Sequence, residues 1–371
     1  CWRNGQGMMA ESNRFDCIVV GGGMLGMLTA RGLKKAGLDV AIMERGEAGR
    51  ESSWAGGGIL SPLVPWRYPD AITELVVWSQ RHYPHLVEEL LHDTGVDAEW
   101  VQSGMLLLNT RIDPAIRRWA DKYASVIETV TPARVRESDP EIAQAREDSV
   151  LLPDVAQIRN PLLVTALARS LRKQGIGFFE QTEVTGLDIA SGKMQGVQTS
   201  RGDYHADRVV IASGAWSSRV MQLAGLELAV EPVRGQMVMF ETRPGLLRHI
   251  TLHEGYYLIP RQNGLVLIGS TLEYTGFNKE TTSEARELLV ERAISLAPVL
   301  ADYEVIRHWA GLRPGTSDGI PFIGKHPGID GLFVNAGHFR NGVVMAPASA
   351  QLLVDILLER DSFTGIQPYS L

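Results

Sequence analysis

The stretch that decides the fold is "FDCIVVGGGMLGMLTARGLKKAGLDVAIMER", residues 15–45. It opens with a short apolar run without alternation, which is typical of a strand buried on both faces of a parallel sheet. Gly21, Gly23 and Gly26 follow directly as G-x-G-x-x-G, and a helix with one apolar face then ends near Gly37. A second strand over residues 39–45 completes the unit. This order of strand, glycines, helix and strand predicts a dinucleotide-binding unit of the Rossmann type.

Each glycine in this unit has a mechanical reason. Gly21 makes the tight turn, Gly23 lets a pyrophosphate approach the backbone, and Gly26 allows the helix to pack closely on the strand. The helix N-terminus then meets the phosphate charge. Glu44 ends the second strand at about the twenty-residue spacing of a ribose-binding acid, and Arg45 beside it is assigned to the same cofactor site.

Composition limits the classes of function. A chain of 371 residues with 44% hydrophobic content suits two domains or one elaborated domain. The net charge of −7, the pI near 5.8 and the lack of a Lys/Arg-rich run argue against a nucleic-acid partner. No apolar stretch is long enough to span a bilayer, and residues 1–14 lack the apolar core of a signal peptide. We therefore expect a cytoplasmic protein without a membrane partner.

The N-terminal residues and the cysteines add two expectations. Tandem Met8 and Met9 suggest that the natural start lies there, and residues 1–14 are expected to form a disordered extension. The two cysteines are Cys1, inside that extension, and Cys17, inside the first strand. A disulfide framework and a cysteine-rich metal site are thereby excluded, and we expect no metal.

The rest of the chain predicts a second kind of domain. Residues 230–305 contain alternating and hairpin-like strands with "QNG" as a turn, which indicates an antiparallel sheet. The fold class is therefore α/β with an α+β second domain: a Rossmann-like cofactor domain, discontinuous in sequence, joined to an antiparallel-sheet substrate domain. The predicted boundaries place the cofactor domain at 15–85, 156–229 and 309–371 and the substrate domain at 86–155 and 230–308.

One arginine stands where the second domain meets a loop rich in glycine and proline. By simple alternation Val305, Arg307, Trp309 and Arg313 lie on one face of a strand, and Pro314 biases the residue before it toward an extended backbone. Loops at strand ends often carry function. From these residues alone Arg313 can be either a surface side chain beside a turn or part of a site.

Several motifs together resemble a known family, the FAD-dependent oxidoreductases similar to D-amino-acid oxidase, and within it the bacterial glycine oxidase group of thiamine biosynthesis. The likeness extends from about residue 15 to the C-terminus. Its first motif is common to many flavoproteins, whereas the last two together are specific. The motifs are the 15–45 unit, "SSWAGGGIL" (52–60), "VVIASGAWS" (209–217), "YYLIPR" (256–261), "WAGLRPGTSDGIPFIGKHP" (309–327) and "AGHFRNGVVMAP" (336–347).

The resemblance implies roles for particular residues. Arg313 and Tyr257 match the pair that binds a substrate carboxylate, and Arg340 matches a residue near the flavin and the substrate. Strand alternation lets only one of Tyr256 and Tyr257 face the flavin, and the motif favours Tyr257. The residues implied to bind FAD non-covalently, beyond Gly21, Gly23, Gly26, Glu44 and Arg45, are Ser52, Ser53, Gly57, Gly58, Ile59, Val184, Gly214, Arg340, Asn341, Gly342 and Val343.

The implied chemistry is oxidation of an amine α to a carboxylate by hydride transfer from Cα to the flavin, followed by hydrolysis of the imine and formation of hydrogen peroxide from dioxygen. Leu252 and Gly255 replace a tyrosine and a histidine of the glycine oxidase pattern, which leaves glycine, sarcosine, N-substituted glycines, iminodiacetate and small D-amino acids open as substrates. The resemblance also implies a homo-oligomer, often a tetramer. A covalent sarcosine oxidase is disfavoured because Cys17 lies within the first strand.

Three other functions fit the sequence less well. A nicotinamide-dependent dehydrogenase shares the opening glycines but does not explain "WAGLRPGT" or "GHFRNG". A tRNA-modifying flavoprotein of the same superfamily conflicts with the acidic charge balance. A non-catalytic FAD-binding scaffold would have no reason to place Arg313 and Tyr257 at the matching positions.

Overall fold

The computed structural model describes residues 13–371. Of the extension expected over residues 1–14, only residues 13 and 14 lie in the described part. There, β1 (Arg14–Phe15) pairs in parallel with β12 (Gly202–Ala206), so the expectation is wrong for Arg14, which belongs to a sheet.

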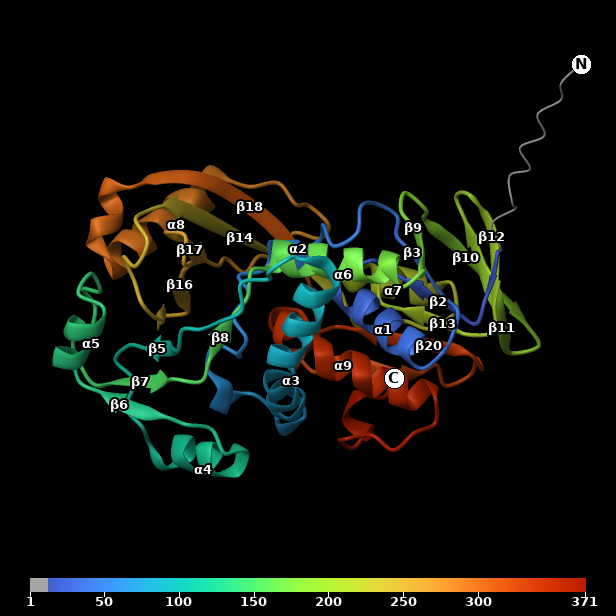
Figure 1. Cartoon of the computed structure of the whole chain (residues 1–371), viewed down its shortest axis with the longest axis horizontal. Helices are drawn as coiled ribbons and strands as arrows, with labels where there is room; N and C mark the ends of the chain where they lie inside the picture. The colour runs from blue at the N-terminus through green and yellow to red at the C-terminus, as the bar shows by residue number, and fades with distance from the viewer. Residues whose placement is uncertain (1–12) are drawn as a thin grey trace, which may run out of the picture.

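A six-stranded sheet forms the centre of the cofactor side of the molecule (Figure 1). Its neighbouring strands are parallel except for the edge strand β19, which is antiparallel to β20. In spatial order the strands are β19 (Phe322–Lys325), β20 (Leu332–Ala336), β13 (Val209–Ile211), β2 (Cys17–Val20), β3 (Val40–Met43) and β9 (Gly177–Phe179). The residues of β2 are all buried, as the run without alternation predicts.

Both faces of this sheet are covered. On one face lies an apolar core shared with α1 (Met24–Lys35), α3 (Asp70–Thr94), α6 (Asn160–Lys173) and α9 (Gly342–Leu357). On the other face lie α7 (Ser217–Gln222) and a four-stranded sheet of β1, β12, β11 (Lys193–Thr199) and β10 (Val184–Ala190). The central sheet is thus the middle of three layers.

Three stretches of the chain each pass from one sheet to another. Residues 15–20 become β1 and β2, residues 176–189 become β9 and β10, and residues 204–217 become β12 and β13. At the first break the carboxylate of Asp16 accepts a hydrogen bond from the backbone N–H of Asp39 at 2.7 Å. A local pattern cannot show such a change of sheet, because it depends on distant partners.

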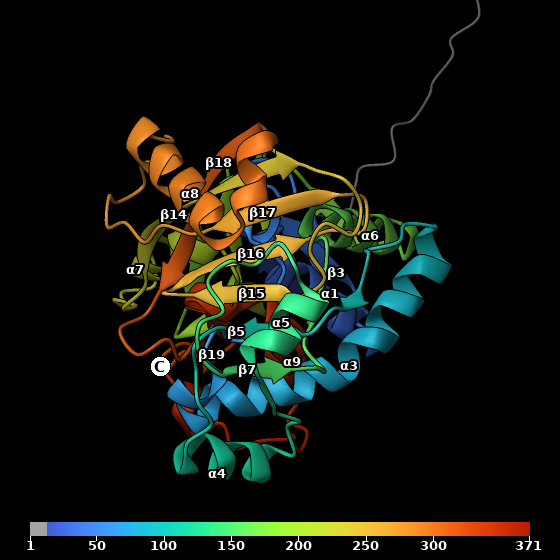
Figure 2. The ribbon, with the colours of Figure 1, turned by 90° about the vertical axis from the view of Figure 1, so that its left-hand side faces the viewer.

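The second body is an eight-stranded sheet with α8 (Ser283–Leu296) packed on one face (Figure 2). It is antiparallel except where β15 runs parallel to β5. In spatial order its strands are β18 (Glu304–Gly315), β14 (Glu231–Glu241), β17 (Leu265–Gly269), β16 (Tyr256–Pro260), β15 (Ile250–His253), β5 (Met105–Leu107), β7 (Ser149–Leu152) and β6 (Glu128–Val130). The substrate domain was predicted to end at residue 308, which lies inside β18. The domain boundaries stay a prediction.

The strand that carries Arg313 departs from simple alternation. The pairing of β14 with β18 shifts so that Phe240 lies opposite Val305 and Met239 lies opposite Arg307, which leaves Ile306 as a bulge. Val305 therefore packs in the core beside α8, whereas Trp309 packs on the opposite face. The prediction that Val305 and Trp309 share a face is wrong for this reason.

Smaller elements complete the chain. A two-stranded ladder is formed by β4 (Val101–Gln102) and β8 (Ala156–Gln157). The remaining helices and short 3-10 turns are α2 (Ser52–Ala55), α4 (Pro114–Tyr123), α5 (Pro132–Ser138), η1 (Pro65–Arg67), η2 (Gly214–Trp216), η3 (Pro298–Asp302), η4 (Phe339–Asn341) and η5 (Gln367–Tyr369). No helix in residues 13–371 is long and apolar enough to cross a membrane.

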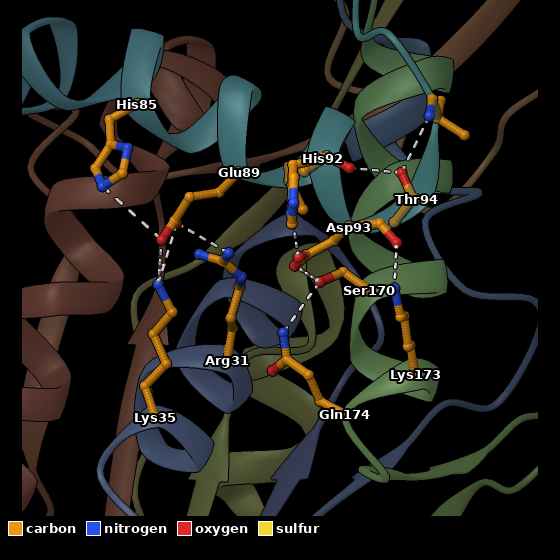
Figure 3. A network of polar contacts seen from close by, with 12 residues as sticks. Arg31, Lys35, His85, Glu89, His92, Asp93, Thr94, Ser170, Lys173 and Gln174 are labelled. Carbon is orange, nitrogen blue, oxygen red and sulfur yellow. Dashed lines mark hydrogen bonds and ion pairs between the residues drawn. The ribbon is translucent and has the colours of Figure 1, made fainter.

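Polar contacts hold the end of α3 against the cofactor side (Figure 3). The carboxylate of Glu89 accepts from Arg31 and Lys35 of α1, each at 2.9 Å. Four residues later Asp93 accepts from the hydroxyl of Ser170 on α6 at 3.0 Å. These contacts join α3 to the helices that cover the cofactor sheet.

A second polar anchor lies within the substrate side. Asp139 is fully buried and accepts from the backbone N–H of Arg248 at 2.7 Å and from Nδ1 of His249 at 2.6 Å. Burial alone would raise the pKa of Asp139, but the hydrogen bonds from His249 and the backbone outweigh it and lower that pKa. The carboxylate thus fixes the segment after α5 to the start of β15.

Candidate cofactor and active site

A cavity of about 370 Å³ opens at the carboxyl ends of the parallel strands β2, β3, β13 and β20. This is the place where open α/β sheets bind ligands. The predicted cofactor residues that line it are Gly21, Gly23, Glu44, Arg45, Ser52, Ser53, Val184, Gly214, Arg340, Gly342 and Val343. The predicted residues that do not line it are Gly26, Gly57, Gly58, Ile59 and Asn341.

The glycines after β2 are required by close backbone contacts. A Cβ on Gly21, whose φ is +117°, would lie 2.4 Å from the carbonyl oxygen of Ala212, and a Cβ on Gly26 would lie 2.0 Å from the carbonyl oxygen of Gly21. Gly26 therefore serves helix packing, which explains its absence from the cavity wall. The first N–H of α1, on Met24, donates to the hydroxyl of Ser53 at 2.9 Å.

Two helix N-termini meet at this cavity. α1 begins after Gly23, and α9 begins after Asn341; neither N-cap residue accepts from its helix with its own side chain, and on α1 the Ser53 hydroxyl accepts from the Met24 N–H alone. Gly23 from the first helix and Gly342 and Val343 from the second line the cavity. Free N–H groups and the helix dipole favour negative charge at a helix N-terminus. The cavity therefore suits an anionic ligand beside each of the two N-termini.

Glu44 is fixed by the turn around it. Its carboxylate accepts from the backbone N–H of Gly22 at 2.7 Å and of Gly46 at 2.8 Å. The guanidinium of Arg45 lies 3.7 Å from the centre of the Trp216 ring and makes an ion pair with Glu51 at 3.5 Å. The acid is therefore preorganised at the cavity edge with acceptor capacity left for a hydroxyl.

Two buried polar atoms in the cavity wall have no partner among the described residues. They are Nε2 of His338 and Oδ1 of Asn335, on side chains that are 2% and 1% exposed. Burial lowers the pKa of His338 to about 3, so the ring is neutral. Since buried polar groups are almost always hydrogen-bonded, these atoms fit a ligand with polar groups of its own.

The side chains of Arg313 and Tyr257 approach each other although their strands, β18 and β16, are separated in the sheet by β14 and β17. Arg313 on β18 lies over Gly235 of β14, where a Cβ would be 2.0 Å from its Nη1. Tyr257 on β16 lies over Gly269 of β17, where a Cβ would be 2.7 Å from its hydroxyl. Since β14 and β17 are neighbours, the two glycines leave room for both side chains to lie flat on the sheet.

Hydrogen bonds orient the Arg313 guanidinium. It donates to the hydroxyl of Ser270 at 2.6 Å and to the carbonyl of Thr271 at 3.2 Å, and it also lines the cofactor cavity. Burial lowers its pKa, while the adjacent Tyr257 favours the charged form. A guanidinium has five N–H donors, so the bonds to Ser270 and Thr271 leave donors for a planar anion.

Tyr256 faces the other way. Its ring packs with the core beside α8 and lies 5.2 Å from the guanidinium of Arg292, whereas Tyr257 packs with Met237 on the opposite face. The structure thus turns Tyr257 toward the site and Tyr256 away from it.

Arg340 joins the cofactor cavity to an open depression. It lines both the cavity and a second hollow of about 560 Å³ bordered by Gly255, Ser270 and Thr271. A Cβ added to Gly255 would meet nothing within 4 Å, and Leu252 packs in the apolar core. At the two departures from the glycine oxidase pattern the chain therefore has an open turn and a buried apolar side chain.

Sequence reasoning placed some residues imprecisely and missed others. Gly58 packs on the segment before α6, where a Cβ would lie 2.0 Å from the carbonyl of Ile158, and Gly56 lines the cavity instead. Gly235 and Gly269 were missed. The signal for them was a glycine inside an otherwise regular strand, which indicates close approach of another group.

The fold and this site define the class: a flavoprotein-type oxidoreductase with a dinucleotide cavity at a parallel sheet and an anion-binding arginine on an antiparallel sheet. Residues 16–356 match the family model described as "FAD dependent oxidoreductase" (DAO), and the chain belongs to that family. It is therefore an FAD-dependent enzyme, and the nicotinamide-dependent interpretation is set aside.

The relatives narrow the class to amino acid oxidases. The chain is 45% identical to a glycine oxidase of Pseudomonas aeruginosa and 43% identical to one of Pseudomonas putida, each over 95% of this chain and 97% of the relative. The crystal structure of glycine oxidase from Geobacillus kaustophilus superposes with a TM-score of 0.91 at 32% identity, over 96% of this chain and 98% of that one. The chain is similar to these enzymes throughout its length.

The residues present fit FAD. The cavity offers two helix N-termini to a pyrophosphate, the Glu44 carboxylate to a ribose, and the unpaired atoms of His338 and Asn335 to further polar groups. Cys17 is fully buried in β2, and burial raises the pKa of its thiol to about 12.

Proposed function

We propose that the protein oxidises glycine or a small amine that carries an α-carboxylate, such as sarcosine, another N-substituted glycine or a small D-amino acid. The observation that carries the proposal is the placement of Arg313. Its guanidinium borders the cofactor cavity and keeps donors free beside the Tyr257 hydroxyl. The resemblance of the whole chain to glycine oxidases supports the same substrate class.

Each side chain has a task in this reaction. The Arg313 fork binds the substrate carboxylate with two parallel hydrogen bonds, and Tyr257 adds a third from β16, across β14 and β17. Together they fix the carboxylate end of the substrate, so that Cα is directed into the cofactor cavity. Arg340 is exposed, lines the cofactor cavity with Arg313 and adds positive charge close to it.

FAD, held non-covalently, would supply the hydride acceptor and then pass the electrons to dioxygen. The positive ends of α1 and α9 favour negative charge in the cavity during this change. The oxidised amine is an imine, and its hydrolysis gives a 2-oxoacid, which is glyoxylate from glycine, together with ammonia or an amine. Hydrogen peroxide is the second product.

The test is a panel of amines assayed for peroxide with the purified flavoprotein. Glycine, sarcosine, iminodiacetate and D-alanine carry the carboxylate that Arg313 binds, and methylamine is the matched compound without it. We expect peroxide from at least one member of the first group and none from methylamine. Equal turnover of methylamine, or none of any carboxylate, would remove the basis for the proposal.

A further inference from the structure

Arg261 is a buried cation that the proposed reaction does not use. It follows β16 directly and is 8% exposed. Its guanidinium donates to Oε1 of Gln157 at 2.8 Å, to the carbonyl of Ile158 at 3.1 Å and to the carbonyl of Gly57 at 2.8 Å. All three acceptors are neutral.

No ion pair neutralises this charge within residues 13–371. The charged groups that act on it, Glu99 and Arg159, are bonded to each other at 2.8 Å. Burial lowers the pKa of Arg261 only to about 10, so it stays charged near neutral pH. Burying an unpaired charge is costly, and an apolar residue of similar size would avoid that cost.

The Gly57 carbonyl belongs to a wall between the two parts of the site. Gly56 lines the cofactor cavity. Behind it, a Cβ on Gly57 would lie 2.7 Å from Cδ1 of Ile259 and 3.5 Å from Cε2 of Tyr257, both on the substrate sheet. In residues 56–58, here called the glycine wall, Gly56 thus borders the cofactor cavity and Gly57 borders the substrate sheet.

We propose that Arg261 is a positioning residue for the flavin, which fixes the glycine wall through the Gly57 carbonyl and supplies uncompensated positive charge behind it. The guanidinium of Arg261 fixes three segments relative to one another: the end of β16, the residues before α6 and the glycine wall. The charge favours the reduced flavin, which gains electrons in a poorly solvated site. The proposal rests on FAD binding and not on which amine is the substrate.

The experiment compares two variants with a matched control. Arg261→Lys keeps the charge and loses the fork, whereas Arg261→Gln loses both. Arg159→Gln removes a neighbouring partly buried arginine that does not contact the glycine wall. For each protein we would measure the dissociation constant of FAD by titrating the apoprotein, the visible flavin spectrum, the reduction potential of the bound flavin, and the affinity for acetate as an unreactive carboxylate.

We expect Arg261→Lys to bind FAD about ten-fold more weakly, the effect of one lost charge-assisted hydrogen bond, and to keep its reduction potential. Arg261→Gln should bind FAD still more weakly and show a lower reduction potential. Acetate affinity should be unchanged in both, because Arg313 is untouched. Arg159→Gln should keep the wild-type FAD affinity and spectrum, because the Gly57 contact is intact; it is not the control for the reduction potential, since Glu99 and Arg159 act on Arg261.

Three results would overturn the proposal. Wild-type FAD affinity, spectrum and potential in Arg261→Gln would show that Arg261 does not act on the flavin. If the affinity for acetate changed as much as the affinity for FAD, Arg261 would act on the substrate-binding part of the site and not on the flavin. Insolubility of both variants beside a soluble Arg159→Gln protein would make it a structural core residue only.

Discussion

Replacing Arg313 by lysine tests the proposed carboxylate site most sharply. The guanidinium donates to Ser270 and Thr271 and has further N–H donors for the substrate carboxylate. Lysine keeps the charge but presents a single ammonium, so one of the two parallel bonds to the carboxylate is lost. A hydrogen bond to a charged group contributes about 1.5–3 kcal/mol, which corresponds to a rise of about 10- to 150-fold in the KM for glycine.

The assay is the rate of flavin reduction under anaerobic conditions, measured as a function of glycine concentration. The matched control is Arg307→Lys on the same strand, where the guanidinium lies 4.6 Å from the Trp54 ring outside the carboxylate site. We expect the control to keep the wild-type KM and both proteins to keep the wild-type flavin spectrum. An Arg313→Lys protein that is half-saturated at the wild-type glycine concentration would refute the assignment.

Two further predictions concern a glycine in the site and a buried acid outside it. Gly235→Ala places a Cβ 2.0 Å from Nη1 of Arg313, so we expect the arginine to be displaced and the KM for glycine to rise at least ten-fold, while FAD binding persists. Asp139→Asn removes the charge that His249 and the backbone stabilise, and we expect a loss of about 1.5–3 kcal/mol in the free energy of unfolding at neutral pH. Because the folded-state pKa of Asp139 is lowered, this difference from the wild type is fully present above the unfolded value of 3.8 and disappears as the pH falls through the folded value.

Kinetics with glycine check the first of these, and an unaltered KM for Gly235→Ala would mean that Arg313 does not need the space over β14. Urea unfolding at a series of pH values checks the second. A difference between wild type and Asp139→Asn that stays constant from neutral to strongly acidic pH would show that the carboxylate charge is not the cause.

The fold of the cofactor half is encoded largely within one local unit, and the sequence predicted that fold for this reason. Turn, helix and strand around Gly21, Gly26 and Glu44 lie within thirty-one consecutive residues. Gly26 is explained by a contact inside that unit, and Gly21 by its φ of +117° and by its contact with Ala212, which follows the adjacent strand β13. The likeness of "WAGLRPGT" to its family also pointed to Arg313, which borders the cavity.

The substrate half depends on register between distant strands, which no single segment shows. The bulge at Ile306 changes the face of Val305, and it is set by pairing with β14, more than sixty residues earlier in the chain. Gly235 and Gly269 matter only because Arg313 and Tyr257 lie over them. The roles of these residues in the reaction stay predictions.

The central claim is that this FAD enzyme draws electrons from an amine whose carboxylate is bound at Arg313. The most direct measurement is the visible absorbance of the bound flavin after anaerobic mixing with glycine or sarcosine, and separately with methylamine. We expect bleaching by at least one of the two amino acids, no bleaching by methylamine, and recovery of the colour with release of peroxide when oxygen is admitted. A flavin that stays oxidised with both amino acids, or that methylamine reduces equally fast, would contradict the claim.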